Sequence, residues 1–74
     1  MKEYEIVGTY LNGCSGTAHP QTVFEEAELS DTDDYVRAKH GKDFDKFQKE
    51  ILPNGQILYT YRSTVTYIYE FTEL

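Results

Sequence analysis

The most regular alternation of apolar and polar side chains runs from Gln56 to Glu73, QILYTYRSTVTYIYEFTE. Branched and aromatic residues fill this stretch, and such side chains suit a pleated, half-buried surface. We therefore expect a β-hairpin that turns near Ser63. A three-residue loop would place Tyr61 opposite Tyr67, Tyr59 opposite Tyr69 and Ile57 opposite Phe71, with Leu58, Thr60, Thr66 and Ile68 on the other face. A two-residue loop would shift this pairing by one residue, and we favour three because each aromatic cross-strand pair stabilises a sheet by about 0.2–1 kcal/mol.

Two more strands are expected in the first half of the chain. From Lys2 to Leu11 both alternating sets contain apolar groups, which predicts a central or two-sided strand. Gly8 in its middle indicates a bulge or a close approach of the backbone. The stretch from Gln21 to Leu29 fits a strand, but it also fits a helix with Pro20 at its first position. We favour the strand, because Ser30 offers a better helix start just after it.

The stretch from Ser30 to Gly41 carries the signals of one short helix. Ser30 can cap it, acidic residues crowd its first turn, basic residues crowd its last turn, and Gly41 provides a left-handed exit. Its apolar side chains are few, so the helix is expected to lie on the sheet rather than inside it.

Residues 42–52 are ambiguous. Phe44, Phe47 and Ile51 have helical spacing, whereas Phe47, Lys49 and Ile51 alternate as in a strand. The turn Pro53-Asn54-Gly55 favours a strand over 44–52 that leads into the hairpin. The predicted fold is therefore a single α+β domain, 1–74, in which one short helix packs on an antiparallel sheet of four to five strands.

The length and composition indicate a thin core. A chain of 74 residues buries only about 60% of its surface on folding, and burying one sheet face in a homodimer would enlarge the core. Cys14 is the single cysteine, so no internal disulfide is expected. No apolar run suggests a signal peptide or a membrane span. We expect a cytoplasmic protein.

The distribution of charge changes this picture most. Thirteen acidic residues against seven basic ones give a net charge of −6, and the acids are concentrated between 25 and 34. An acidic surface repels nucleic acid and membranes and attracts basic protein surfaces. The predicted protein-binding residues are Glu25, Glu26, Glu28, Asp31, Asp33 and Asp34.

The acidic stretch has two interpretations. In a strand, Glu26 and Glu28 project from one face about 7 Å apart, and the aspartates of the helix start would extend this row. Such a row can engage the lysines and arginines of a DNA-binding protein, as a row of phosphates does. The alternative is that the acids only keep the protein soluble and that an aromatic or apolar sheet face carries recognition.

Catalysis and metal binding are not expected. No local signature surrounds Cys14, His19 or His40, so no enzyme activity is predicted. The three aspartates resemble the opening of a calcium loop, but that loop needs glycine and glutamate where this chain has Val36 and Lys42. One cysteine and two distant histidines do not make a zinc site, so no metal or cofactor is predicted.

The stretch AELSDTDDYVRAKHG is followed by LPNGQILYTYR and VTYIYEF. In this layout, and in its size and acidity, the chain resembles small phage-encoded inhibitors of host machinery, which include anti-CRISPR proteins and DNA mimics that block nucleoid proteins such as HU. The likeness covers most of the chain, consists of spacing and composition, and assigns no site residue. It implies a basic nucleic-acid-binding protein as partner, for example a nucleoid protein or a nuclease complex. The acidic charge of the chain separately predicts no direct contact with nucleic acid or membrane.

Overall fold

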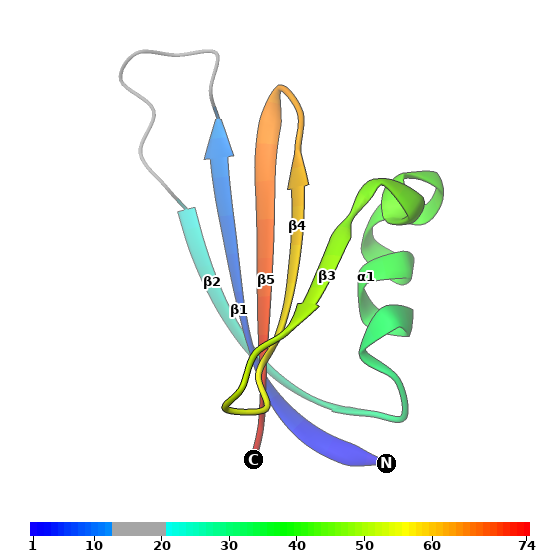
Figure 1. Ribbon diagram of the computed structural model, residues 1–74, viewed down its shortest axis with the longest axis vertical. Helices are drawn as coiled ribbons and strands as arrows, with labels where there is room; N and C mark the ends of the chain where they lie inside the picture. The colour runs from blue at the N-terminus through cyan, green and yellow to red at the C-terminus, as the bar shows by residue number, and fades with distance from the viewer. Residues whose placement is uncertain (13–20) are drawn as a thin grey trace.

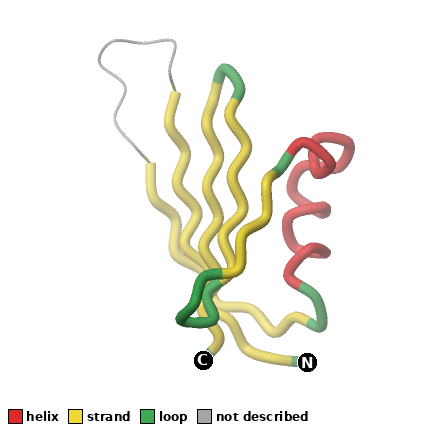
Figure 2. The backbone as a smooth tube through the Cα atoms, viewed as in Figure 1, coloured by secondary structure: helices red, strands yellow, loops and turns green. Residues whose placement is uncertain are grey.

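The computed structural model describes residues 1–12 and 21–74. This part of the chain forms a five-stranded antiparallel sheet in the order β2-β1-β5-β4-β3, with the helical segments between β2 and β3 (Figures 1 and 2). The elements are β1 (Lys2–Asn12), β2 (Gln21–Leu29), α1 (Thr32–His40), the 3₁₀ helix η1 (Gly41–Lys46), β3 (Gln48–Ile51), β4 (Ile57–Arg62) and β5 (Val65–Glu73). The predicted α+β class and the antiparallel sheet are confirmed, and the order of the elements along the chain is the one expected.

The hairpin of β4 and β5 has the predicted register. Tyr61 pairs with Tyr67 and Tyr59 pairs with Tyr69, while Ile57 lies opposite Phe71. The last pair of the hairpin is Arg62 with Thr66, so three residues, 63–65, separate its two members. The three-residue loop is therefore confirmed, and the aromatic side chains of both strands gather on one face of the sheet.

The core lies on this aromatic face. Its most buried side chains are at most 2% exposed: Ile6, Val36, Tyr59, Tyr69 and Phe71. Val36 belongs to α1, and the ring of Tyr35 in the same helix lies 6.1 Å from the ring of Tyr69 and 5.5 Å from that of Phe71. Aromatic packing of this kind is typically edge-to-face, as it is here. The helix thus contacts the aromatic face, which we call the covered face.

Gly8 lies under two tyrosine rings of the covered face. A Cβ atom at this position would stand 3.4 Å from the hydroxyl of Tyr10 and 3.4 Å from a ring carbon of Tyr69. The strand pairing runs through Gly8 on both sides without a bulge, opposite Val23 and Tyr69. Of the two expectations for this glycine, the close approach is therefore the one that the structure contains.

The predicted N-cap of the helix is corrected. The N-cap is Asp31 rather than Ser30, because the extended backbone of Asp31 lets its carboxylate accept a 2.9 Å hydrogen bond from the amide of Asp33. The exit at Gly41 is as expected, with φ of 56°. Neither helical segment within the described residues is long and apolar enough to cross a membrane.

The strand expected over 44–52 begins only at Gln48. The preceding residues form η1, because their two phenylalanines reach back to the covered face and its helix. Phe44 lies under the guanidinium of Arg37 at 4.6 Å, and the ring of Phe47 is 5.2 Å from that of Tyr61. The helical spacing of these residues therefore describes 44–47, and the strand is limited to four residues.

Candidate functional site

The second face of the sheet carries no helix among the described residues, and we call it the uncovered face (Figure 1). Strand pairing shows which residues lie on this face, because residues directly opposite one another project to the same side of the sheet. Val7 lies between Phe24 and Glu70, which in turn pairs with Leu58. The apolar side chains of this face, which we call the apolar centre, are Val7, Leu11, Phe24, Leu58 and Ile68, with Thr9, Thr60 and Glu70 among them. Phe24 is the most exposed large aromatic side chain among the described residues, at 70%.

Glutamates lie to one side of this apolar centre and run obliquely across the sheet. Glu3 stands opposite Glu28, and Glu5 stands opposite Glu26. Side chains in such pairs are about 5 Å apart across the strands and about 7 Å apart along each strand. Glu70 on β5 and Glu50 on β3 continue the diagonal. We call the six residues the acidic belt: Glu3, Glu5, Glu26, Glu28, Glu50 and Glu70.

No member of the acidic belt takes part in the ion pairs present among the described residues. The acids in those five pairs are Glu25, Asp33, Asp34, Asp43 and Glu73. Arg62 is the one base at a strand position of the uncovered face, and the undescribed stretch 13–20 contains no lysine or arginine. Like charges directly opposite each other on a sheet are destabilising. The facing pairs Glu3–Glu28 and Glu5–Glu26 are therefore expected to lower the stability of the fold.

The six predicted binding residues do not form one row. Glu26 and Glu28 lie on the uncovered face, as a strand alternation requires. Glu25 points to the covered side, where it accepts a hydrogen bond from the hydroxyl of Tyr35 and pairs with Lys39 at 3.3 Å. Both contacts lower the pKa of Glu25, and the hydrogen bond from the Tyr35 hydroxyl has the larger effect.

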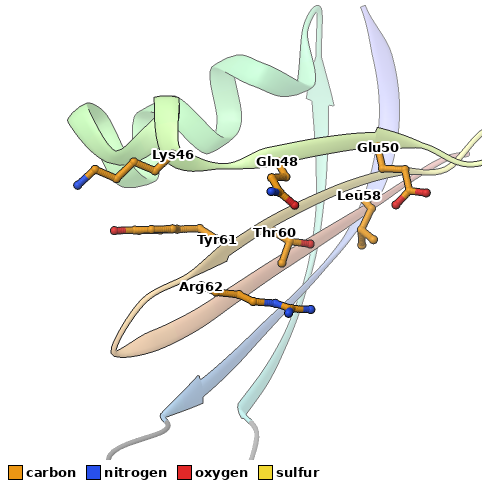
Figure 3. A pocket seen from close by; sticks show the side chains of 7 residues that line it. All are labelled: Lys46, Gln48, Glu50, Leu58, Thr60, Tyr61 and Arg62. Carbon is orange, nitrogen blue, oxygen red and sulfur yellow. The ribbon is translucent and has the colours of Figure 1, made fainter.

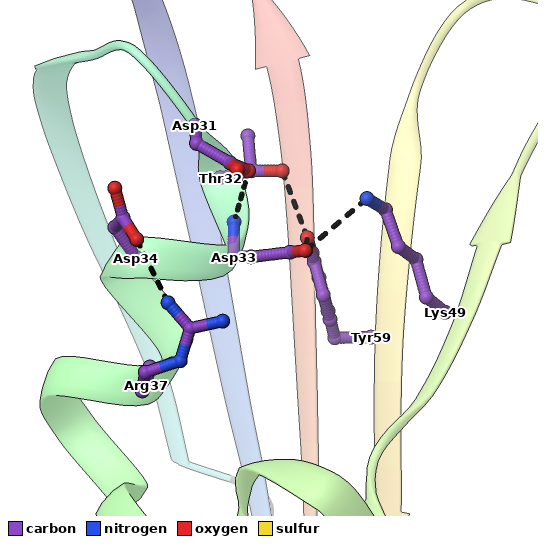
Figure 4. Close-up of polar contacts among 7 residues, drawn as sticks. All are labelled: Asp31, Thr32, Asp33, Asp34, Arg37, Lys49 and Tyr59. Atoms are coloured by element: carbon purple, nitrogen blue, oxygen red, sulfur yellow. Dashed lines mark hydrogen bonds and ion pairs between the residues drawn. The ribbon is translucent and has the colours of Figure 1, made fainter.

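The three predicted aspartates are also held by the chain itself (Figure 4). Asp31 caps the helix, and Asp34 pairs with Arg37 at 2.9 Å. Asp33 accepts a hydrogen bond from Tyr59 and pairs with Lys49 at 3.1 Å. Of the three, only Asp33 bridges α1 to the sheet, whereas the contacts of Asp31 and Asp34 lie within the helix and its cap.

This junction contains a buried hydroxyl. Thr32 is only 2% exposed, and its side-chain oxygen lies 2.8 Å from the hydroxyl of Tyr59. The Tyr59 hydroxyl, followed by the charges of Lys49 and Arg37, lowers the pKa of Asp33, while partial burial acts in the opposite direction. Burial raises the pKa of Tyr59. Asp33 is thus an ionised acceptor that ties the helix to β4 and β3.

Replacing Asp33 by asparagine is expected to remove part of the acid sensitivity of the fold. Because the pKa of Asp33 is lower in the folded state than its unfolded value of about 3.9, its contribution is complete above about pH 5 and is lost as the pH falls through the folded-state pKa. Asp33→Asn should therefore cost about 1–3 kcal/mol at pH 7 and less at pH 3. Urea unfolding followed from pH 7 to pH 2.5 measures this difference.

The matched control for that series is Asp45→Asn. Asp45 is exposed, and its carboxylate is in none of the side-chain hydrogen bonds or ion pairs found among the described residues. This variant should keep the pH dependence of the unchanged protein. Identical pH profiles for Asp33→Asn and the unchanged protein would show that Asp33 has no such role.

Sequence reasoning missed four members of the acidic belt: Glu3, Glu5, Glu50 and Glu70. They are scattered along the chain, and strand pairing places all four on the same face as Glu26 and Glu28. The available signal was the alternation itself, which already placed Glu5 and Val7 on one side of the first strand.

The uncovered face is hollowed at its β3–β4 end (Figure 3). An open cleft of about 480 Å³ lies there between Gln48 and Glu50 on one strand and Leu58, Thr60 and Arg62 on the next, with Lys46 at its end. The cleft is polar, and it holds the basic corner of an otherwise acidic face. An acidic side chain of a bound protein could be accepted beside Arg62.

The comparisons with known proteins give no match. No protein-family model matches this chain, and neither a curated protein nor a solved structure is significantly similar to it. Its function must therefore be inferred from its own geometry.

Of the three residues weighed from the sequence for catalysis or metal binding, only His40 lies within the described part of the chain. Cys14 and His19 lie outside the described residues. The ring of His40 packs 4.6 Å from that of Tyr67, and its Nε2 lies 2.6 Å from the hydroxyl of Tyr69. Burial lowers the pKa of His40. Within residues 1–12 and 21–74 no three acidic, histidine or cysteine side chains are grouped as metal ligands would be.

Proposed function

We propose that this protein is a non-enzymatic binding protein whose uncovered sheet face occupies a basic, nucleic-acid-binding surface of another protein. The observation that carries this proposal is a square of four glutamates on the uncovered face: Glu3 opposite Glu28, and Glu5 opposite Glu26. None of the four has an ion-pair partner among the described residues. A chain with seven bases holds five of them in ion pairs with other acids. Uncompensated charge of this kind costs stability unless a partner neutralises it.

Carboxylates suit such a partner chemically. Like phosphates, they accept short, charge-assisted hydrogen bonds from lysine and arginine, and arginine can bind them with two parallel bonds. The apolar centre beside the square, with Val7, Phe24 and Ile68, supplies the packing that stable interfaces have at their core. The proposed partner is a nucleoid protein or a nuclease complex, met in the cytoplasm. A phage-encoded inhibitor of such host machinery would act in this way, by excluding DNA or RNA.

A second candidate function rests on the exposure of Phe24. In this alternative the apolar centre alone carries recognition of a partner, and the acidic belt only keeps the protein soluble. The aromatic face weighed for this role from the sequence is largely occupied by the core and α1, so the apolar centre of the uncovered face takes its place.

Capture from a bacterial lysate tests the two candidates together. The immobilised protein should retain a basic nucleic-acid-binding protein, which rising salt between about 0.05 and 0.5 M releases and which double-stranded DNA displaces. Phe24→Ser should weaken this capture only partly. If the amount of captured protein is unchanged by salt and by DNA but falls to zero with Phe24→Ser, the apolar centre is the recognition surface and the acidic belt is not.

A further inference from the structure

The two edges of the sheet differ in how well they are protected. β3 forms one edge over only four residues, and it ends in a turn that contains Pro53 and is closed by a 2.8 Å hydrogen bond from Leu52 to Gln56. Short edge strands and proline are common protections against strand pairing. This edge therefore offers little backbone to a further strand.

β2 forms the other edge over nine residues, Gln21–Leu29. Its pairing with β1 is continuous from Lys2–Leu29 to Tyr10–Gln21, without a bulge, and the strand contains no proline or glycine. Seven of its nine residues are exposed. No described strand pairs with its outer side, so alternate backbone N–H and C=O groups along β2 have no ladder partner there.

We propose that β2 accepts an extended basic segment of the partner as a sixth strand of the sheet. This inference rests on the proposed function, because it assigns the partner's chemistry at the same acidic region. The unpaired backbone groups supply the hydrogen bonds of strand addition, and the side chains of β2 select the sequence that binds.

The charges of β2 identify the occupant. On the uncovered face, Phe24, Glu26 and Glu28 repeat about every 7 Å, so an incoming strand would meet them with one apolar and two basic side chains at alternate positions. On the covered side Glu25 is already bonded to Tyr35 and Lys39, so the alternate residues there should be neutral. A second copy of β2 is a poor occupant, because the three glutamates of one copy would lie close to the three glutamates of the other.

A synthetic peptide of this pattern provides the probe. In antiparallel pairing, acetyl-Thr-Lys-Thr-Lys-Thr-Val-Thr-amide would place its lysines opposite Glu28 and Glu26 and its valine opposite Phe24. Two N-methylated analogues serve as controls, one blocked at the even residues and one at the odd residues. Both keep every side chain and charge, but only one of them loses the backbone donors that would face β2.

Amide hydrogen exchange of the whole protein, followed by NMR at about 0.02 M salt, gives the readout. With saturating peptide, alternate amides of β2 should exchange at least about fivefold more slowly, and one N-methylated analogue should lose this effect while the other keeps it. The change Glu26→Gln with Glu28→Gln should weaken binding of the parent peptide. Sedimentation of the protein alone should show a monomer at the concentration used.

Three results would overturn strand addition. Equal binding of the parent and both analogues would mean that the charges alone attract the peptide. Absence of peptide binding would mean that β2 does not accept a strand of this pattern. A dimer with protected β2 amides before peptide is added would mean that a second copy occupies the edge. Salt-sensitive capture of a folded basic protein is measured separately, so none of these results by itself removes the proposed function.

Discussion

Reversing Glu26 and Glu28 to lysine is expected to stabilise the fold and to weaken partner binding at least about tenfold, which corresponds to 1.4 kcal/mol. Each substitution turns a like-charged cross-strand pair, with Glu5 and with Glu3, into an attractive one. Cross-strand charge pairs are worth about 0.2–1 kcal/mol each, so the free energy of unfolding should rise by about 0.4–2 kcal/mol. The same two charges would then repel a basic partner.

Opposite signs in the two measurements separate a binding role from a structural one. Urea unfolding of Glu26→Lys with Glu28→Lys should show a higher midpoint than the unchanged protein at about 0.02 M salt, and a smaller difference at about 0.5 M. A lower midpoint at low salt would mean that these glutamates stabilise the sheet. The inference that they destabilise the fold and therefore serve binding would then be wrong.

Replacing Phe71 by alanine is expected to have the largest effect on stability, a loss of about 3–5 kcal/mol. Phe71 is 1% exposed, and its ring packs against three tyrosines at centroid distances of 5.4 to 6.2 Å, namely Tyr4, Tyr35 and Tyr59. A domain of this length has a total stability of about 4–11 kcal/mol. The variant should therefore be partly or wholly unfolded at 37 °C, as measured by circular dichroism during heating.

Phe24→Ala is the matched control, since it makes the same change on the other face of the sheet. Phe24 is 70% exposed, so its loss should alter the free energy of unfolding by no more than about 0.5 kcal/mol. Equal losses from the two variants would mean that the uncovered face is buried in solution, for example in a homodimer.

The hairpin was the part of the fold that sequence could define in most detail. The alternation of Tyr59, Tyr61, Tyr67 and Tyr69 fixes which face each side chain occupies, and aromatic pairing then selects one register among two. The strand assignment of 21–29 also agrees with the structure. The competing helix failed there because the following residues form a better capped helix of their own.

The segments around the helix depended on tertiary contacts that local patterns do not contain. Phe44 and Phe47 form a 3₁₀ turn because they pack on Arg37 and on the aromatic rings of the covered face. Ser30 and Asp31 are both good N-caps, and only the geometry of the chain leaving β2 decides between them.

The candidate site was predictable only in part for the same reason. Strand alternation alone separates Glu25 from Glu26 and Glu28, but the pairing of Glu25 with Lys39 depends on where α1 packs. The acidic belt gathers glutamates from β1, β2, β3 and β5, and the order of strands in the sheet cannot be read from a run of charges.

The most direct test of the acidic belt as a binding surface compares two variants with the same change in net charge. Glu26→Lys with Glu28→Lys alters the uncovered face, whereas Asp34→Lys with Asp45→Lys alters the helical segments on the covered side. Dissociation constants are measured by titration with the captured protein at about 0.1 M salt. The first variant should bind at least about tenfold more weakly than the unchanged protein, and the second within about threefold of it. Equal weakening of both variants would contradict the claim, because net charge rather than this face would then govern binding.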